Sequence, residues 1–390
     1  MKSKWQTKCL GDVCEIIKGR KPLLRESPSN GDLPYLVAKV MRGSEKPQFA
    51  SIKDKNSVVV AESETIIICD GSNSGEVFTG FRGVLSSTMG KISKKTEIDD
   101  DYLRTVLAST FVVFNAAKTG TAIPHLDKEA MYAFQFPCPP LPEQKRIVGI
   151  LDEAFDGIAT AKACAEKNLQ NARELFKSYL QSAFSHRGEG WTETTLGDVC
   201  QFENGDRGKN YPKREEYVES GIPWINTGHI QPDGTLSAGE MNFISRGKYE
   251  SLRSGKIRPG DLVYCLRGAT LGKTALVDPF TAGAVASSLV IIRPSDLLDR
   301  RFLYYFLTSP VGQRLIRLYD NGAAQPNLGA QSVAKYTISL PKLAEQKVIV
   351  QKLDALATET QLLASIYEQK LAALDTLKKS LLHEAFTGAL

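Results

Sequence analysis

The clearest hydrophobic pattern of the chain is an apolar stripe that occurs twice, from residue 143 on and again from residue 345 on. In both stretches apolar residues recur at alternating spacings of four and three, which predicts a long helix with a heptad seam. Pro142-Glu143 suits the first turn of such a helix. We expect the seams to contain Ile147, Leu151, Ile158, Leu175 and Tyr179 in the first helix, and Ile349, Leu353, Leu356, Leu363, Leu374 and Leu381 in the second.

Each stretch of about 40 residues would form a helix about 60 Å long, at roughly 1.5 Å per residue. A lone helix that exposes an apolar stripe is unstable in water. We therefore predict that the two helices pair with each other, antiparallel if the two halves of the chain are related by a pseudo-two-fold axis. The alternative is that each helix packs only on its own domain.

The remaining segments favour short strands. Apolar runs bounded by Gly, Pro, Asp or Asn lie at 66–68, 262–264 and 288–292. One helix is expected in each half, over 102–117 and 302–319, because apolar residues recur there at helical spacing after acidic residues. Asp99 is expected to cap the first of these. The predicted fold class is α+β, with two mixed globules and two long helices.

The strand-like segments repeat as well. Leu10-Gly11-Asp12-Val13-Cys14 recurs at 196–200, and Glu143-Gln144-Lys145 recurs at 345–347. We align Cys69 and Gly71–Gly75 with Cys265 and Gly268–Gly272 in the same way. The offset between the copies grows from 186 to 202 residues, which indicates small insertions in the second copy. The chain is therefore one unit written twice.

Composition narrows the function only partly. Hydrophobic residues make up 42% and charged residues 24%, as in ordinary folded proteins. A net charge of +5 permits nucleic-acid binding without demanding it. Neither a signal peptide nor an apolar run long enough to span a membrane is present, so a cytoplasmic location is expected. The seven cysteines form no C-x-x-C pair, and we expect them to be small buried residues rather than disulfide or zinc ligands.

No catalytic or metal-binding constellation is apparent in the sequence. Gly268-Ala269-Thr270-Leu271-Gly272-Lys273-Thr274 resembles a P-loop but is one residue short between its glycines. Glu143-x-Lys145 could be half of a nuclease site, but no suitable acid precedes it, and a helix start explains it. We therefore expect no catalytic residue, no metal and no cofactor in this chain.

Two similar globules on a rigid spacer suit double-stranded DNA with two separated half-sites. Glycine-containing loops after the first strand of each unit carry Lys18, Arg20 and Lys21, and Asn204, Arg207 and Lys209. Arg20 and Arg207 suit base edges, and Lys21 and Lys209 suit phosphates. A second pair of loops adds Ser72, Asn73, Arg267 and Thr270, and Gln325 and Asn327 either read bases or form a turn. The alternative for all of these residues is a solvated turn.

These motifs together resemble the specificity (S) subunit of a type I restriction-modification system. The resemblance rests on the repeated segment 5–14 and 191–200, on Ile222-Pro223-Trp224-Ile225, on 321–328, on the two Glu-Gln-Lys helix starts and on the two seams. It implies two target recognition domains, over 1–140 and 188–340, and two helical spacers, over 141–187 and 341–390.

The resemblance also implies partners. Each recognition domain would read one half of a split, asymmetric DNA site, and the paired helices would dock two methyltransferase (M) subunits. The M subunits would use S-adenosylmethionine to methylate adenine, and restriction (R) subunits would use ATP and Mg²⁺ to cleave unmodified DNA. The alternatives are a free-standing DNA-binding regulator or anti-restriction decoy of the same architecture, and a coiled-coil scaffold without a DNA role.

Overall fold

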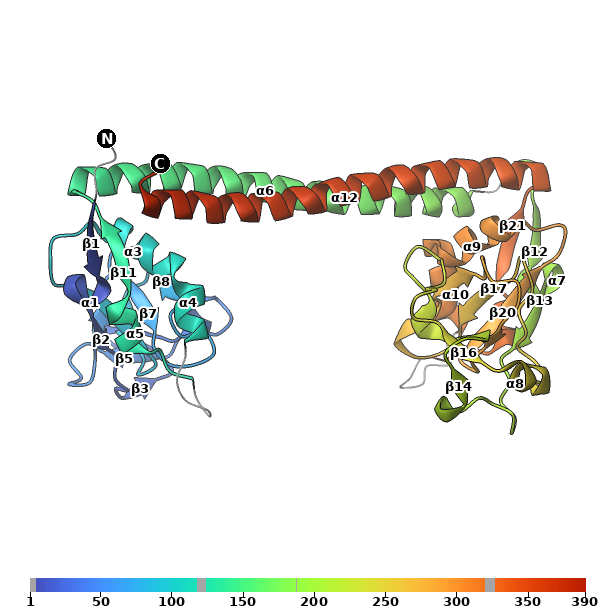
Figure 1. Ribbon diagram of the computed structural model, residues 1–390, viewed down its shortest axis with the longest axis horizontal. Helices are drawn as coiled ribbons and strands as arrows, with labels where there is room; N and C mark the ends of the chain where they lie inside the picture. Colours follow the sequence, from blue (N-terminus) through green and yellow to red (C-terminus); the bar gives the residue numbers. More distant parts are fainter. Residues whose placement is uncertain (1–4, 118–123, 187, 320–326) are drawn as a thin grey trace. The chain divides into compact units, whose positions relative to one another are not determined.

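The chain forms two compact units. The computed structural model describes residues 5–117, 124–186, 188–319 and 327–390 (Figure 1). Unit 1 comprises Met1–Cys164 with Lys370–Leu390, and unit 2 comprises Ala165–Gln369. Both long helices, α6 (Leu141–Ser185) and α12 (Leu343–Thr387), therefore contribute one half to each unit.

Unit 1 is built on a four-stranded antiparallel sheet in the order β2-β10-β7-β8. Its strands are Cys14–Lys18, Met89–Lys94, Ile66–Ile68 and Val77–Phe78. A five-stranded sheet in the order β3-β5-β4-β9-β6 comprises Leu24–Arg25, Phe49–Ser51, Asp32–Leu36, Gly83–Leu85 and Val59–Val60. The strands β1 (Gln6–Cys9) and β11 (Gln135–Cys138) form an antiparallel pair.

Unit 2 has the same plan. Its main sheet, β13-β20-β17-β18, comprises Cys200–Asn204, Leu289–Pro294, Leu262–Cys265 and Thr274–Leu276. The sheet β14-β16-β15-β19 comprises Tyr217–Val218, Asn242–Ile244, Ile222–Ile225 and Ala284–Val285. The strands β12 (Thr192–Thr195) and β21 (Thr337–Leu340) match β1 and β11. The repeat predicted from the sequence is therefore confirmed, and so are the three predicted strand segments.

Four of the shorter helices of each unit correspond. Unit 1 has α1 (Leu10–Val13), α2 (Ala38–Met41), α3 (Asp100–Ser109), α4 (Phe111–Ala116) and α5 (Lys128–Ala133). Unit 2 has α7 (Leu196–Val199), α8 (Arg246–Ser251), α9 (Arg300–Thr308), α10 (Pro310–Tyr319) and α11 (Ala330–Ala334), with 3₁₀ turns at Arg214–Glu216, Thr227–His229 and Gly268–Thr270. The helices α1, α3, α4 and α5 correspond to α7, α9, α10 and α11, whereas α2 follows β4 and α8 follows β16.

The single helices predicted over 102–117 and 302–319 are wrong, because each is broken into two. In unit 2 the break falls at Pro310, which has no backbone N–H to donate and which favours the extended conformation seen at Ser309. In unit 1 it falls at Thr110, whose hydroxyl donates to the carbonyl oxygens of the preceding turn. The predicted cap is correct, because the Asp99 carboxylate accepts from the N–H groups of Asp101 and Tyr102.

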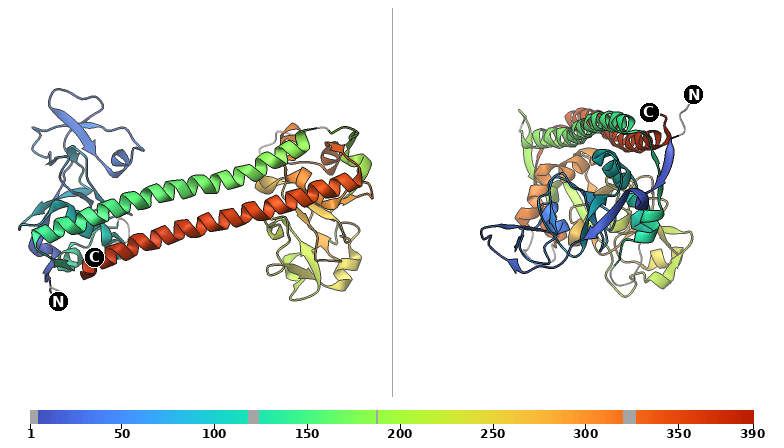
Figure 2. Two further views of the ribbon diagram at one scale, coloured as in Figure 1. Left: turned by 90° about the horizontal axis from the view of Figure 1, so that it is seen from above. Right: turned by 90° about the vertical axis from the view of Figure 1, so that its left-hand side faces the viewer.

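The long helices α6 and α12 lie side by side and run antiparallel (Figure 2). In unit 1, Lys162 of α6 pairs with Asp375 of α12. In unit 2, Arg173 pairs with Glu368 at 2.9 Å, so residue numbers rise along one helix as they fall along the other. The α+β fold class with paired antiparallel helices is therefore confirmed.

The seam itself follows the predicted heptads only in part. The side chains of Ile147, Leu151, Ile158 and Leu353 are buried, and those of Ile349, Leu356, Leu374 and Leu381 are partly buried. Leu175, Tyr179 and Leu363 are exposed, so their predicted place in the seam is wrong. Leu180 is the residue that α6 buries beyond Ala172. An α-helix that is not supercoiled drifts by about 20° per heptad, so after several heptads the buried position moves on by one residue.

A buried glutamine locks the start of each long helix to the short helix beside it. In unit 2, the Gln346 side chain accepts from the N–H of Asp299 at 2.8 Å and donates to the carbonyl oxygens of Leu297 and Pro341, both at 2.9 Å. In unit 1, Gln144 accepts from the N–H of Asp99 at 2.9 Å. The repeated Glu-Gln-Lys motif therefore marks a buried clasp as well as a helix start.

The clasp yields a first prediction. Gln346→Ala should lower the free energy of unfolding of unit 2 by about 2–4 kcal/mol, because it leaves one part-buried N–H and two carbonyl oxygens without this partner. Urea unfolding followed by tryptophan fluorescence measures the effect. Gln351→Ala, at an exposed position of the same helix, is the control and should unfold like the unsubstituted chain. Equal unfolding of the two variants would contradict a role for the clasp.

Candidate nucleic-acid interface

The first pair of candidate loops begins at equivalent strand ends. Lys18 ends β2 opposite Gly90, and Asn204 ends β13 opposite Val290, in the same register. The sequence had suggested that the loops follow the first strand of each unit. In the structure they follow β2 and β13, which are the second strands. Arg20, Lys21, Arg207 and Lys209 follow on these loops and are exposed.

From the sequence, the glycines of these loops are expected to let the backbone approach a phosphate, but the structure gives them a different role. A Cβ on Gly19 would lie 2.2 Å from the carbonyl oxygen of Ser86, and one on Gly205 would lie 2.5 Å from that of Ala286. Both glycines are buried against the neighbouring chain segment. They permit close packing of two backbone segments rather than freedom to approach a phosphate.

Asp206 fixes the shape of the unit 2 loop, a role that the sequence did not reveal. Its buried carboxylate accepts from the N–H of Gly208 at 2.6 Å and from the N–H of Arg253 at 2.8 Å. The N–H groups of Arg253 and Gly208 hold the pKa of this carboxyl below its usual range. Arg207, beside it, donates to the carbonyl oxygen of Ser287 at 3.3 Å and is held near the loop surface.

The second pair of loops is also equivalent, and the structure corrects the alignment. The N–H of Gly75 donates to the oxygen of Ile68 at 2.8 Å, and that of Gly272 donates to the oxygen of Cys265 at 2.9 Å. Cys265 therefore corresponds to Ile68, and Cys69 corresponds to Leu266 instead of Cys265. By the same register, Arg267 stands where unit 1 has Asp70.

A third segment joins each site through an isolated antiparallel bridge. Asp70 bridges to His125 in unit 1, and Arg267 bridges to Asn327 in unit 2. Three chain segments thus meet in each unit, and they bring together Lys18, Asp70 and His125 in unit 1. The predicted site residue Gln325 lies outside the described residues.

The unit 1 cluster is held together by a carboxylate. Asp70 pairs with Lys18 at 2.8 Å through one oxygen and with Nδ1 of His125 at 2.8 Å through the other. Burial opposes the charged form of Asp70, but the hydrogen bonds from Lys18 and His125 hold the pKa of its carboxyl below the usual range. The sequence prediction singled out Lys18 but included neither Asp70 nor His125 among the site residues.

The loops that follow carry opposite charges. The N–H of Glu76 donates to the oxygen of Asn73 as that of Lys273 does to Thr270, so Glu76 and Lys273 are equivalent. In unit 1, Glu76 pairs with Arg42 and accepts from the Asn73 amide at 3.2 Å. In unit 2, Arg267 and Lys273 are exposed, and the Thr270 hydroxyl lies 3.3 Å from the Cys265 sulfur. The candidate Ser72 is exposed on the unit 1 loop.

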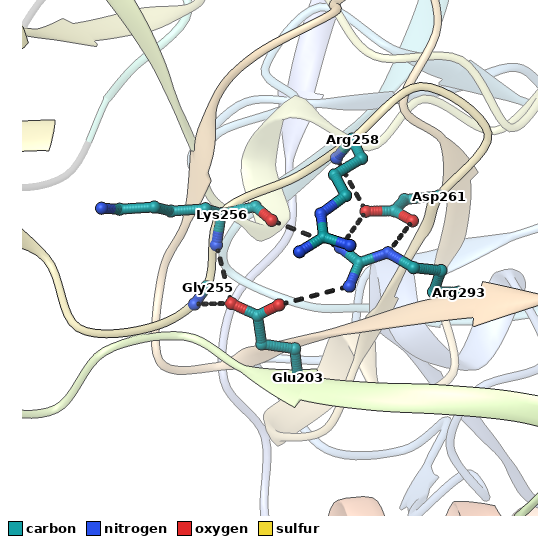
Figure 3. A network of polar contacts seen from close by, with 6 residues as sticks. All are labelled: Glu203, Gly255, Lys256, Arg258, Asp261 and Arg293. Carbon is teal, nitrogen blue, oxygen red and sulfur yellow. Dashed lines mark hydrogen bonds and ion pairs between the residues drawn. The ribbon is translucent and has the colours of Figure 1, made fainter. Parts of the chain in front are cut away.

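A largely buried ion pair links β20 to the residue before β17, and Arg293 also reaches β13. Figure 3 shows Arg293 of β20 between the carboxylates of Asp261 and Glu203. Arg293 donates to both oxygens of Asp261 at 2.8 Å and approaches Glu203 at 3.5 Å. Hydrogen bonding to Asp261 raises the pKa of the Arg293 guanidinium. Glu203 also accepts from the N–H groups of Gly255 and Lys256, which ties the neighbouring loop to β13.

The structure also bears on a phosphate-binding loop, a metal site and a membrane-spanning helix. The segment resembling a P-loop connects β17 to β18, and a strand follows it where a phosphate-binding loop requires a helix. Among the described residues, no group of three or more His, Cys, Asp or Glu could hold a metal ion. No helix in the described part of the chain is long and apolar enough to cross a membrane.

The cysteines are mostly as expected. Five are buried, and burial raises the thiol pKa of Cys14 and Cys69 to about 11 and that of Cys200 to about 12. Cys164 is exposed and Cys9 is partly exposed, so the expectation of burial is wrong for these two.

Comparison with known proteins identifies relatives over nearly the whole chain. The model of the type I restriction modification DNA specificity domain matches residues 2–168 and 188–369. The MjaVIII specificity subunit of Methanocaldococcus jannaschii is 27% identical over 98% of this chain and 92% of that protein. The EcoBI specificity subunit of Escherichia coli is 22% identical over 85% of this chain and 74% of that protein.

Two solved structures share the fold. One, described as the structural basis of complex assembly and conformational transition of the type I R-M system, has a TM-score of 0.77 at 22% identity and covers 99% of this chain and 98% of its own. The HsdS subunit from Thermoanaerobacter tengcongensis has a TM-score of 0.60 at 21% identity, over 99% and 97%. With its twice-matched specificity domain, the chain belongs to the type I restriction-modification DNA specificity family: it is a DNA-binding specificity (S) subunit, itself non-catalytic.

Proposed function

We propose that the two units read the two halves of a bipartite, asymmetric double-stranded DNA site. Residues 1–140 and 188–340 would be the recognition domains, and 141–187 and 341–390 the helical spacers. The observation that carries this proposal is that both units repeat one backbone framework, whereas the exposed residues at equivalent places differ, as at Lys18 and Asn204. One framework with different exposed groups suits two half-sites of different sequence.

The base and phosphate contacts would come from the loops described above. In unit 1 these are Lys18, Arg20, Lys21, Ser72 and Asn73; in unit 2 they are Asn204, Arg207, Lys209, Arg267, Thr270 and Asn327. Gln325, which lies outside the described residues, is a further candidate for unit 2. Arginine suits guanine, asparagine suits adenine, and lysine suits phosphate. Preformed loops support this role, because side chains fixed before binding lose less freedom when they bind.

The helices would dock two methyltransferase subunits. In unit 2, Leu175 and Tyr179 of α6 and Leu362 and Ile366 of α12 are between 43% and 62% exposed; we call these four side chains the helix patch. The pair Arg173–Glu368 places Leu175 level with Ile366, and Tyr179 level with Leu362, along the helices. Exposed apolar side chains gathered in this way are typical of a protein-binding surface.

The chemistry would then reside in the partners. The methyltransferase subunits would bring S-adenosylmethionine and methylate adenine, and restriction subunits would bring ATP and Mg²⁺ chemistry and cleave unmodified DNA. The complex would act in the cytoplasm, where the DNA is. This chain would supply only the choice of sequence and the place of assembly.

The central test is methylation mapping. The chain is co-expressed with the methyltransferase encoded beside it, and methylated adenines are mapped genome-wide. We expect one split motif that depends on this chain, and exchange of residues 188–340 for those of another family member should change one half of the motif only. An active methyltransferase without a chain-dependent motif, or an exchange that changes both halves, would contradict the proposal.

The helix patch gives a separate prediction. Leu362→Asp combined with Ile366→Asp should reduce co-purification of the methyltransferase by about tenfold or more, because charges replace two apolar anchors. Pull-down from co-expressing cells measures the effect. The control is Leu297→Asp, an exposed leucine of unit 2 outside the helix patch, which should leave assembly unchanged. Normal complex formation by the double variant would remove the helix patch as a docking surface.

The positive charge of Lys273, at the place where unit 1 has Glu76, predicts a contribution to the salt dependence of DNA binding. Lys273→Ala should reduce the slope of log affinity against log salt by about 0.9, as expected for one lost phosphate contact on duplex DNA. Fluorescence anisotropy of the complex on its target at several salt concentrations measures the slope. Lys342→Ala, an exposed lysine at the start of the long helix, should leave it unchanged. An unaltered slope in Lys273→Ala would place the loop away from the phosphates.

A further inference from the structure

We infer that Lys18, Asp70 and His125 form a single base-reading cluster in unit 1 that recognises the major-groove edge of adenine. This inference rests on the proposed function, in which unit 1 reads one half-site. It adds the base, the hydrogen-bonding groups and a positioning role for Asp70.

The contacts fix which atoms donate and which accept. Both oxygens of Asp70 are engaged, one by Lys18 Nζ and the other by His125 Nδ1, each at 2.8 Å. A carboxylate only accepts, so the hydrogen of a neutral imidazole in this pair sits on Nδ1. Nε2 of His125 is then an acceptor, whereas the Lys18 ammonium remains a donor.

Exposure separates the holding group from the reading groups. The Asp70 side chain is 13% exposed, whereas those of Lys18 and His125 are 41% and 52% exposed. Asp70 is therefore a positioning residue that orients its two neighbours from behind. The two groups that can reach DNA are one donor and one acceptor, fixed relative to each other.

This pair of groups matches one base. In the major groove, adenine presents the N7 acceptor beside the N6 amino donor. Guanine presents two acceptors, cytosine presents a donor, and thymine presents an acceptor beside a methyl group. Lys18 donating to N7 and His125 accepting from N6–H would satisfy both groups of adenine. A guanine in place of the adenine would leave His125 Nε2, an acceptor, facing the lone pairs of guanine O6, which is also an acceptor.

A purely structural role for the cluster is disfavoured by unit 2. There the same backbone places are occupied by Asn204, Arg267 and Asn327, and the sheet register and the bridge form without a carboxylate or an imidazole. The fold therefore closes without this cluster. What unit 1 gains from it is a particular arrangement of exposed hydrogen-bonding groups.

The test uses the complex with its methyltransferase. Wild-type chain, Asp70→Asn and His125→Ala are co-expressed with the methyltransferase, complex size is checked by gel filtration, and methylated motifs are mapped genome-wide. In Asp70→Asn, the amide can donate to His125 Nδ1, which moves the imidazole hydrogen to Nε2. The cluster then presents two donors, which match guanine.

We expect Asp70→Asn to lose the preference for adenine at one position of the unit 1 half-site by roughly 5- to 150-fold, the range for one specific base contact, with a shift towards guanine. His125→Ala, which removes the acceptor, should lose the same preference, and the unit 2 half-site should not change. Glu62→Gln, a carboxylate-to-amide change at an exposed residue of unit 1, is the matched control and should keep the whole motif.

The outcomes separate this inference from the proposed function. If the wild-type chain directs a split motif but both variants keep every base preference, or lose methylation equally at all sites, the inference is wrong and the proposed function stands. If the wild-type chain directs no motif, both fail. If Asp70→Asn does not assemble, His125→Ala decides alone, because the His125 side chain is half exposed and an unchanged adenine preference in this variant overturns the inference.

Discussion

In each unit the hydrophobic core is completed by a helix segment from the other half of the sequence. The core of unit 1 contains Ala385, from the far end of α12, beside Ile147 and Leu151 of α6. The core of unit 2 contains Leu180, from the end of α6, beside Val350 and Leu353 of α12. Aromatic rings at the helix ends make the same kind of contact. The ring centroids of Phe386 and Tyr102 are 5.9 Å apart, and those of Phe184 and Phe302 are 5.1 Å apart. Because buried apolar side chains are the main source of stability, neither half of the chain holds all the residues that its own unit needs.

This constraint explains why the framework is kept in duplicate while the exposed residues differ. Each core receives residues from both repeats. The helix ends, the glutamine clasps and the sheet registers must fit that core, so a change in any of them alters the burial of apolar side chains. The loop residues carry no such demand. Asp70 and Glu76 can be exchanged for Arg267 and Lys273 at the same backbone places, and the charge of the loop is reversed without altering its turns.

The sequence predicted those features that depend on many residues at once. The repeat, the fold class and the two long helices follow from periodic patterns. Features that depend on one atom in three dimensions were missed. The burial of Gln346 cannot be read from a glutamine in a helical first turn, and the close packing of Gly205 cannot be told from a flexible loop glycine.

The helix seam and the loop alignment show a second limit of prediction from the sequence. A strict heptad placed Leu175 in the seam because the drift of a straight helix accumulates beyond the length over which a pattern can be counted. The match between Cys69 and Cys265 was attractive because the residues are identical, but backbone hydrogen bonds set the register and place Leu266 there instead. Identity of a single residue is weaker evidence of equivalence than a shared hydrogen bond.

The same arrangement occurs at three places in the two units. At each of them a shielded carboxylate accepts hydrogen bonds from basic side chains or from the backbone of a loop. Asp70 holds Lys18 and His125, Asp206 holds the N–H groups of Gly208 and Arg253, and Asp261 holds Arg293 and the N–H of Arg258. Several donors surround each carboxylate, and these donors lose conformational freedom when the chain folds rather than when it binds. A subunit whose task is to choose a sequence needs such rigidity, because a mobile basic loop binds any phosphate, whereas a fixed donor or acceptor distinguishes one base edge from another.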